Sequence, residues 1–509
     1  MQDTSANNKR IAKNTLVLYA RMFLMMAVSL YTSRIVLKTL GVEDFGVYNV
    51  VGGIVSMMGV INGAMSVSTT RYLTFELGRG DMDRLKQTFS MCVNIYVLLA
   101  LVLLVLSETI GVWFLNTQLV IPADRMVAAN WVFQFSILST IFSLLTNPYN
   151  AVIISREKMS IYAYISLADA ILKLAIVYLL LVIPYDKLVV YGFMLMLLHV
   201  LNTSVYFIYC NKKYLESRYF FYWETPLFKE LLSYTGWNLF GSASGMAKGQ
   251  GLNIILNMFF NPSVNAARGI AYQVNTNVSH FFTNFYVAVR PQITKYYAQG
   301  DLENMFKLVF RSSKMSFFLV LLLSLPLIIE APYVIELWLG QLPEYVVPFM
   351  RLILVITAVD SMANPLMTTA HATGKIALYQ SLVGTITILN VPISYIFLYL
   401  GSGPVVVFEI SLIISILNLF TRLWIVNRLL DFPVFGYIKT VLLNCLFVAI
   451  LSAFLPIVVY RFVDNNFTGF SMVCSVSLIS TIIAIYYVGL NRNERMVLQE
   501  FAKKKFYRK

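Results

Sequence analysis

Charged residues are scarce in this sequence. Only 13% of its 509 residues are Asp, Glu, Lys or Arg, whereas 58% are hydrophobic, and the mean hydropathy is +0.71. A water-soluble chain of this length needs far more polar surface to remain in solution. The composition therefore excludes a soluble globular protein and predicts a chain that resides in a lipid bilayer.

Residues that hold metals or perform catalysis are also scarce. The four cysteines all fall in apolar stretches, without the spacing of a disulfide or a zinc site. The three histidines form no metal-ligand pattern with cysteines or carboxylates, and the sequence has neither a Walker loop nor a nucleophile elbow. We therefore expect no catalytic residues, no metal site, no cofactor and no ATP hydrolysis by this chain.

Long apolar runs, by contrast, are abundant. Each can cross ~30 Å of hydrocarbon as an α-helix, which rises 1.5 Å per residue. By this length rule we recognise about fourteen runs. They cover residues 15–38, 46–70, 89–115, 126–150, 159–183, 187–210, 232–260, 265–288, 310–333, 346–370, 376–400, 404–427, 438–461 and 468–490.

The positive charges have an uneven distribution along these runs. With an even number of spans and both termini in the cytoplasm, most of the 39 lysines and arginines fall on the cytoplasmic side. This bias explains the net charge of +14 without a nucleic-acid partner. The basic tail at the C-terminal end is expected to lie against anionic lipid headgroups.

The sequence contains an internal repeat. An Asn-Pro pair followed by a tyrosine fifteen positions after the asparagine occurs at 147–162 and again at 364–379. A Gly-Asp pair occurs at 80–81 and again at 300–301, at nearly the same offset and in the same topological position. Two such matches indicate that a six-helix unit is duplicated.

The duplication predicts the architecture. Because six spans is an even number, both copies enter the membrane from the same side and form a parallel repeat, with a substrate path between them. The predicted fold class is all-α, a polytopic membrane protein with about 14 transmembrane helices in two parallel six-helix lobes plus a C-terminal helix pair. The expected parts are an N-lobe at 1–210, an interfacial linker at 211–231, a C-lobe at 232–430, a helix pair at 431–490 and a basic tail at 491–509.

Several ionisable residues fall inside the predicted spans, where each costs at least about 2.5 kcal/mol unless it is compensated. Asp169 and Lys173 are four residues apart on one helix face, which indicates either a mutually neutralising pair or a role in moving substrate or ions. Lys248 has no such local partner and lies on a polar stripe of a glycine-rich run, which favours a water-filled cavity. Asp360 and Glu409 are further acids that we expect to be buried.

Other basic residues lie in the first and eighth runs. Arg268, Tyr272 and Asn275 share one helical face and resemble a wall that binds sugar and phosphate, although such a stripe could also join neighbouring helices. Arg21 and Arg34 are thirteen positions apart. Since this places them about 220° apart around an ideal helix, both can face one cavity only if the helix bends.

Parts of the sequence resemble a known family. Asn14 and Arg21 enter the first run, residues 40–48 read LGVEDFGVY at the turn into the second, and residues 71–81 read RYLTFELGRGD in the following loop. Together with the repeat and the number of spans, these segments are similar to those of the polysaccharide transporter family. This is the O-antigen flippase group of the multidrug/oligosaccharidyl-lipid/polysaccharide exporter superfamily.

The resemblance implies a function. Such a protein moves a polyprenyl-pyrophosphate-linked oligosaccharide from the inner to the outer leaflet of a bacterial inner membrane, by alternating access around a cationic central cavity. It implies membrane lipids, and a glycan polymerase and glycosyltransferases of lipopolysaccharide synthesis, as partners. By their positions, the cavity residues would be Lys248, Arg268, Arg21, Arg34, Lys173, Tyr272 and Asn275, and those coupling transport to a proton or sodium gradient would be Asp169, Asp360 and Glu409.

Other functions remain open. A cation-coupled multidrug exporter of the same superfamily would need buried acids and aromatic residues, whereas the first run here carries arginine. A membrane glycan polymerase or glycosyltransferase would need a large outer loop, whereas the outer loops here are short. A major-facilitator transporter is disfavoured because residues 78–84 lack its loop motif.

Overall fold

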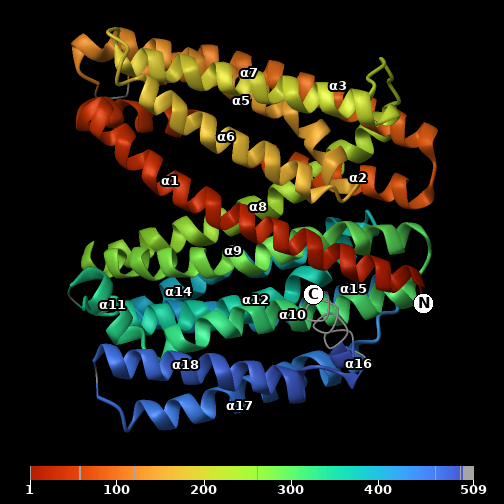
Figure 1. The fold of residues 1–509 in the computed structure, drawn as a ribbon, viewed down its shortest axis with the longest axis vertical. Coiled ribbons are helices and arrows are strands. Elements are labelled where there is room, and N and C mark those ends of the chain that lie inside the picture. Colours follow the sequence, from red (N-terminus) through yellow and green to blue (C-terminus); the bar gives the residue numbers. More distant parts are fainter. Residues whose placement is uncertain are drawn as a thin grey trace, which may run out of the picture. The chain divides into compact units, whose positions relative to one another are not determined.

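The protein is helical throughout the part that a computed structural model describes, residues 2–56, 59–117, 121–260, 262–340, 342–464, 466–492 and 494–496. Short connections join the helices (Figure 1). The predicted all-α polytopic fold is therefore confirmed. Residues 497–509, which make up most of the predicted basic tail, lie outside the described part.

Two compact units are present. Unit 1 comprises Met1–Ser242 and Thr294–Gly300, and unit 2 comprises Ala243–Ile293 and Asp301–Lys509. The first part of α8 (Thr225–Phe259) and the last residues of α9 (Pro262–Ala298) therefore belong to unit 1, whereas the rest of these two helices belongs to unit 2.

The remaining helices divide between the units as follows. Unit 1 contains α1 (Gln2–Ser56), α2 (Gly59–Arg79), α3 (Met82–Leu106), η1 (Ser107–Gly111), α4 (Val112–Thr117), η2 (Ala123–Arg125), α5 (Met126–Ser155), α6 (Met159–Leu179), α7 (Lys187–Lys213) and η3 (Leu215–Ser217). Unit 2 contains α10 (Leu302–Ile329), α11 (Ala331–Leu339), α12 (Val346–Ala372), α13 (Ala377–Ile388), α14 (Asn390–Tyr399), α15 (Val406–Leu430), α16 (Val434–Tyr437), η4 (Ile438–Leu442), α17 (Leu443–Tyr460), α18 (Phe467–Ala484) and η5 (Ile485–Gly489).

Eleven helical segments of the described chain are long and apolar enough to cross a membrane. Helices also occupy most of the described residues of the predicted spans at 46–70, 232–260 and 265–288, but among the described residues these three do not meet that standard. They are less apolar because they carry glycines and polar side chains, Lys248 and Arg268 among them. Polar residues are therefore concentrated in the helices that carry the leading candidate site residues.

The described residues of the second predicted span lie in α1 and α2, and the first predicted span lies within α1. The direction of α1 changes at Gly41, where φ is 81° and ψ is 171°. This conformation is open to glycine and strongly disfavoured for residues with a Cβ. The predicted turn into the second span is thus a non-helical kink at Gly41 between two helical parts of α1.

The two Gly-Asp pairs of the sequence repeat have the same local structure. Gly80 and Gly300 both have positive φ, 77° and 73°. Asp81 caps α3 and Asp301 caps α10, each by accepting a hydrogen bond from a backbone N–H three residues later, at 2.9 and 3.1 Å. The repeated sequence therefore builds the same helix start twice, which supports the duplication, while the lobe boundaries stay a prediction.

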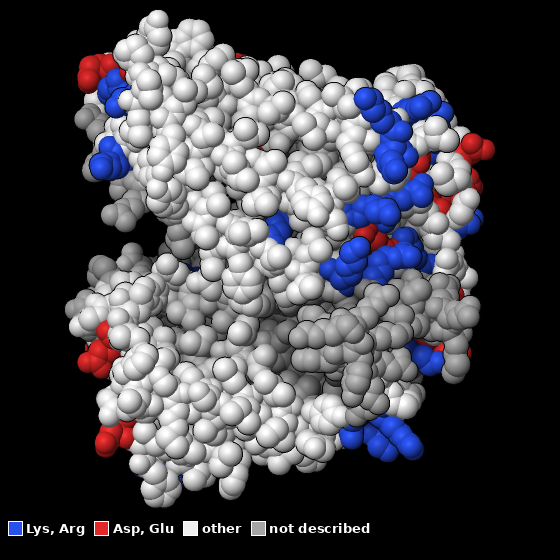
Figure 2. All heavy atoms as spheres, viewed as in Figure 1, with Lys and Arg blue, Asp and Glu red and all other residues white. Residues whose placement is uncertain are grey.

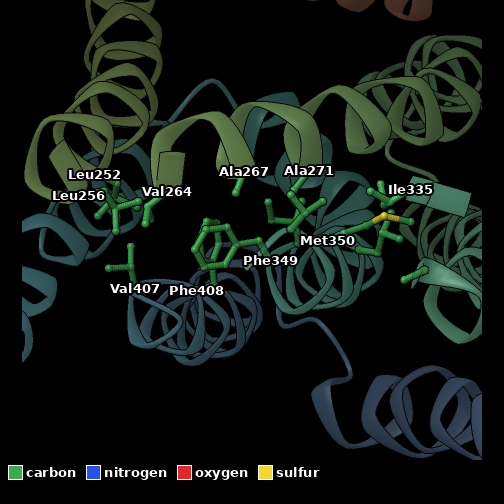
Figure 3. Packing of buried hydrophobic residues seen from close by; sticks show 14 of the residues in the cluster. Leu252, Leu256, Val264, Ala267, Ala271, Ile335, Phe349, Met350, Val407 and Phe408 are labelled. Carbon is green, nitrogen blue, oxygen red and sulfur yellow. The ribbon is translucent and has the colours of Figure 1, made fainter. Parts of the chain in front are cut away.

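A hydrophobic core joins α8, α9, α12 and α15 in unit 2 (Figure 3). The small residues Ala267 and Ala271 of α9 are fully buried in it. The rings of Phe349 on α12 and Phe408 on α15 have centroids 4.4 Å apart, and Tyr272 of α9 lies at the edge of the core, 6.5 Å from Phe408. Close packing is a main force between helices in lipid, so this core fixes the positions of the polar side chains on the same helices.

The outward-facing side chains are largely apolar. Figure 2 shows a face that is almost free of charge over most of its area, with Lys and Arg gathered mainly toward one end of the helices. Large hydrophobic side chains on many helices are exposed, for example Val105, Ile110, Ile413 and Phe454. Such a surface suits contact with lipid tails, since hydrocarbon offers no hydrogen-bond partners to polar groups.

The segment predicted as an interfacial linker is attached to α3. Asn94 of α3 donates a hydrogen bond to the carbonyl of Tyr222 at 2.7 Å. Glu224 accepts hydrogen bonds from Arg84 and Tyr222, and these bonds, that from Arg84 above all, lower the pKa of the Glu224 carboxyl. Two aromatic side chains of the segment, Phe221 and Trp223, remain exposed. Exposed aromatic rings suit a position at a membrane surface.

Candidate functional site

Charged side chains of unit 2 converge on Asp360 of α12. The carboxylate of Asp360 accepts a hydrogen bond from the hydroxyl of Ser415 on α15. It also interacts electrostatically with Lys248 of α8 and Arg422 of α15. We refer to Lys248, Asp360 and Arg422 as the charged cluster. The cluster contains two basic side chains and one carboxylate, so its formal charge is positive.

Arg422 is held by aromatic residues. Its Nε donates a hydrogen bond to the hydroxyl of Tyr379 on α13 at 2.9 Å. Tyr379 is only 2% exposed and packs edge-on against His371, with ring centroids 5.5 Å apart. Arg422 also interacts electrostatically with Tyr286 of α9. These contacts orient the guanidinium toward the interior of unit 2, although α15 ends only eight residues later, at Leu430.

Arg268 fastens α9 to the glycine-rich α8. Its Nη2 donates to the carbonyl of Gly249 at 2.7 Å, and its Nη1 donates to Oδ1 of Asn253 at 3.2 Å. The guanidinium lies 4.6 Å from the ring centroid of Tyr272, a cation–π distance. Arg268 thus contacts both α8 and Tyr272 of its own helix.

Asn275 of the predicted stripe, and Tyr286 further along α9, contact α12. Asn275 accepts a hydrogen bond from Thr357, and Tyr286 shares one with Thr368. These bonds join two neighbouring helices, which was the alternative interpretation of the stripe. Arg268 contacts α8 and Tyr272, whereas Asn275 serves a contact between α9 and α12.

Lys248, Asp360, Arg422 and Tyr272 are all half-buried and come from four helices. Basic groups that are partly withdrawn from water and only partly neutralised can bind an anion strongly, because few water molecules compete for them. Among the residues that the structure describes, no group of His, Cys, Asp and Glu could hold a metal ion. The arrangement is suited to binding a charged ligand.

The predicted pair in unit 1 is present. Lys173 Nζ lies 2.8 Å from Oδ2 of Asp169 on the same face of α6. Asn202 of α7 donates a further hydrogen bond to Asp169, and His199 of α7 interacts electrostatically with both charges. The neutralising-pair interpretation is therefore confirmed in geometry, and Lys173 adds no uncompensated charge.

Arg21 belongs to the same unit. Its guanidinium lies 4.4 Å from the ring centroid of Tyr162 on α6, and it interacts electrostatically with Tyr206 of α7. Tyr162 and Tyr379 occupy corresponding positions of the repeat, 217 residues apart, and each contacts an arginine. The side chain of Arg34, another predicted cavity residue, lies outside the described residues, although its backbone is part of α1.

The prediction that Glu409 is a buried acid is wrong. Glu409 is exposed and lies in the first turn of α15. A negative side chain is favourable there because the helix N-terminus carries a partial positive charge. Glu409 thus lies within an apolar run of the sequence, but its side chain is not buried among the packed helices.

Sequence reasoning missed Arg422 and Tyr379. Arg422 is near the end of its apolar run, where a basic residue fits the cytoplasmic bias of positive charge. In the structure, however, it interacts electrostatically with Asp360. One signal was available, because Tyr379 is the repeat partner of Tyr162 and therefore belongs to the duplicated pattern.

Comparison with known proteins gives matches in structure alone. No family model matches the chain, and no curated protein matches it significantly in sequence. A multidrug resistance MATE family transporter of the MOP superfamily, solved in an outward-facing conformation, aligns with a TM-score of 0.72 at 12% identity, over 84% of this chain and 97% of the other.

Two further solved structures are similar. MATE in complex with MaD3S aligns with a TM-score of 0.70 at 14% identity, over 83% of this chain and 97% of that one. A MOP superfamily transporter from Pyrococcus furiosus, described as having a binding pocket of reverse polarity, aligns with a TM-score of 0.67 at 12% identity, over 82% and 96%. The chain has the fold of these transporters.

The pair in unit 1 leads to a prediction about stability. Asp169→Asn or Lys173→Met alone should destabilise the protein, because each leaves one charge without its partner, whereas the double variant should regain much of the loss. We expect a coupling energy of about 1 kcal/mol. It can be measured from the unfolding of the four purified proteins in detergent. Strictly additive effects of the two substitutions would show that the pair does not act as a unit.

Proposed function

We propose that this protein is a membrane exporter that moves a polyprenyl-pyrophosphate-linked oligosaccharide from the inner to the outer leaflet of a bacterial inner membrane. The observation that carries this proposal is the charge balance of unit 2, where the basic side chains of Lys248 and Arg422 interact electrostatically with the carboxylate of Asp360. Arg268 of α9 adds a further positive charge beside Tyr272.

The chemistry of such a substrate fits this site. A pyrophosphate carries two or more negative charges, and moving them into a medium of low dielectric is costly unless basic groups compensate. Tyrosine and asparagine side chains next to the basic groups can bind sugar hydroxyls, as Tyr272 and Asn253 could here. The polyprenyl chain would need only an apolar path, and the exposed surfaces of the helices are apolar.

The proposed mechanism is alternating access, without covalent chemistry. Gly245 and Gly249 of α8 have free space around them, so this part of the helix can bend, whereas Gly251 packs against Val391. Cytoplasmic termini, an inner-membrane location, and contacts with a glycan polymerase and glycosyltransferases are further parts of the proposal. They rest on the resemblance of residues 40–48 and 71–81 and on the distribution of basic residues.

A second function has specific support. The structural comparisons include a multidrug resistance transporter, so they favour a multidrug exporter at least as directly as a flippase. In that function Asp360 and the aromatic rings of Tyr272 and Tyr379 would bind an organic cation. The transporter with a pocket of reverse polarity supports the idea that this fold can accept pockets of either sign.

Transport by the purified protein in proteoliposomes separates these two functions. The wild-type protein should move a fluorescent polyprenyl-pyrophosphate oligosaccharide out of the leaflet that is accessible to a quencher. Lys248→Ala and Arg422→Ala should each slow this movement about tenfold or more, because the loss of a charge-assisted contact is worth roughly 1.5–3 kcal/mol. Asp360→Asn should retain or increase it, because this variant has more net positive charge.

The matched control is Lys307→Ala, which removes an exposed basic side chain of α10 in the same unit. It should transport at the wild-type rate. Wild-type rates in both Lys248→Ala and Arg422→Ala would refute the cationic site. Transport of a lipophilic cation that is lost in Asp360→Asn would instead establish the multidrug function.

Coupling to a proton or sodium gradient is a further part of the proposal. Asp169 and Asp360 are the acids available for it inside the helices, and the exposure of Glu409 removes the reason for including that residue. We expect transport to slow when both gradients are collapsed by ionophores in the same proteoliposomes. An unchanged rate would exclude coupling to either ion.

A further inference from the structure

The turn between α5 and α6 contains an unexpected residue. Glu157 has a φ of 58°, in the left-handed region that favours glycine. The corresponding residue of the repeat, 217 positions later, is Gly374, with a φ of 79°. Both donate their backbone N–H to the carbonyl three residues before, at 2.9 and 3.1 Å, and both follow the end of a helix. The second copy thus has the residue that this turn favours, and the first copy has a glutamate.

The carboxylate of Glu157 joins segments that are far apart in the sequence. Its side chain is fully buried. Lys295, near the end of α9, donates a hydrogen bond to Oε1, and Nη1 of Arg10 on α1 lies 3.5 Å from Oε2. Asn14 of α1 donates to the main-chain carbonyl of Glu157 at 3.1 Å. One residue therefore holds α1 and the end of α9 to the α5–α6 turn.

The end of α9 also packs closely against α2. A Cβ added at Gly78 would lie 2.6 Å from Cβ of Ala298 and 3.1 Å from Cα of Lys295, so a side chain there would collide with α9. The rings of Phe75 and Tyr297 have centroids 6.1 Å apart. These contacts all lie within unit 1, which includes Thr294–Gly300, whereas the preceding part of α9 belongs to unit 2.

A purely local role does not explain this glutamate. Glycine would form the same turn with less backbone strain, as Gly374 does, and would avoid the burial of a carboxylate. What Glu157 adds are ion pairs with Lys295 and Arg10. A buried ion pair is weak evidence for stability, so its role depends on what its breakage would release. Here, breakage would release the end of α9, the helix that also carries Arg268.

We propose that Glu157 is a latch that fastens the end of α9 within unit 1, and that loss of the Lys295 ion pair lets this helix end separate from α2 and from the α5–α6 turn. The latch itself is independent of the substrate. Its use in a transport cycle, in which α9 would change partners between two states, rests on the proposed function.

Hydrogen exchange of the purified full-length protein, followed by mass spectrometry, tests the latch directly. Glu157→Gln should increase the exchange rate of residues 294–300 about tenfold or more, because local opening no longer requires rupture of the ion pair. Exchange in α17 and α18 should not change. The matched control is Glu303→Gln, which breaks an exposed Glu–Lys pair on α10 and should leave residues 294–300 as protected as in the wild type.

Two more variants complete the test. Lys295→Met breaks the same ion pair from the other side, and it also serves if Glu157→Gln does not fold. The double variant should exchange at 294–300 no faster than the faster single variant, because both substitutions remove the same ion pair between Glu157 and Lys295. Unchanged exchange in the folded single variants, or additive effects in the double variant, would refute the latch. Since no substrate is present, this result does not depend on whether the proposed transport is correct.

Discussion

Compensation of charge inside the helices is the constraint on which this structure depends. Packed helices and lipid provide no water to solvate an ion, so each buried ionisable side chain needs a polar partner. In unit 1, Asp169 and Lys173 neutralise each other. In unit 2, Lys248 and Arg422 both interact electrostatically with Asp360, and the formal charge of these three residues stays positive. The two units thus differ in charge balance.

The two units also differ in how a tyrosine contacts an arginine. Tyr162 and Tyr379 correspond in the repeat and both contact an arginine, through a cation–π contact in unit 1 and a hydrogen bond in unit 2. The apolar core around Phe349 and Phe408 keeps α8, α9, α12 and α15 together, so the polar side chains of these helices meet at Asp360 (Figure 3). Apolar packing therefore positions the helices, and the charged side chains that it positions distinguish the two units.

Local features were predictable from the sequence. The helical class follows from runs long enough to cross hydrocarbon, and the Asp169–Lys173 pair follows from its spacing of four residues on one helix. The helix starts at Asp81 and Asp301 follow from the repeated Gly-Asp pair. In each case the interacting groups are close in sequence.

Contacts between distant segments were not predictable in the same way. Asp360 is more than a hundred residues from Lys248 and more than sixty from Arg422, and a single sequence contains no information on which helix faces meet. The error at Glu409 has a similar cause, since hydropathy locates an apolar run but not the residue at which the helix begins. The glutamate at position 157 became informative only when its positive φ and its buried partners were known.

The most direct test of the excess positive charge in unit 2 is equilibrium binding to the purified wild-type protein at several salt concentrations. One ligand is a polyprenyl pyrophosphate without sugars, and the other is a lipophilic organic cation of similar size. The account predicts that the pyrophosphate lipid binds more tightly and that its Kd rises as salt screens the basic side chains. Preferential binding of the cation, or binding of the pyrophosphate lipid that does not respond to salt, would contradict it.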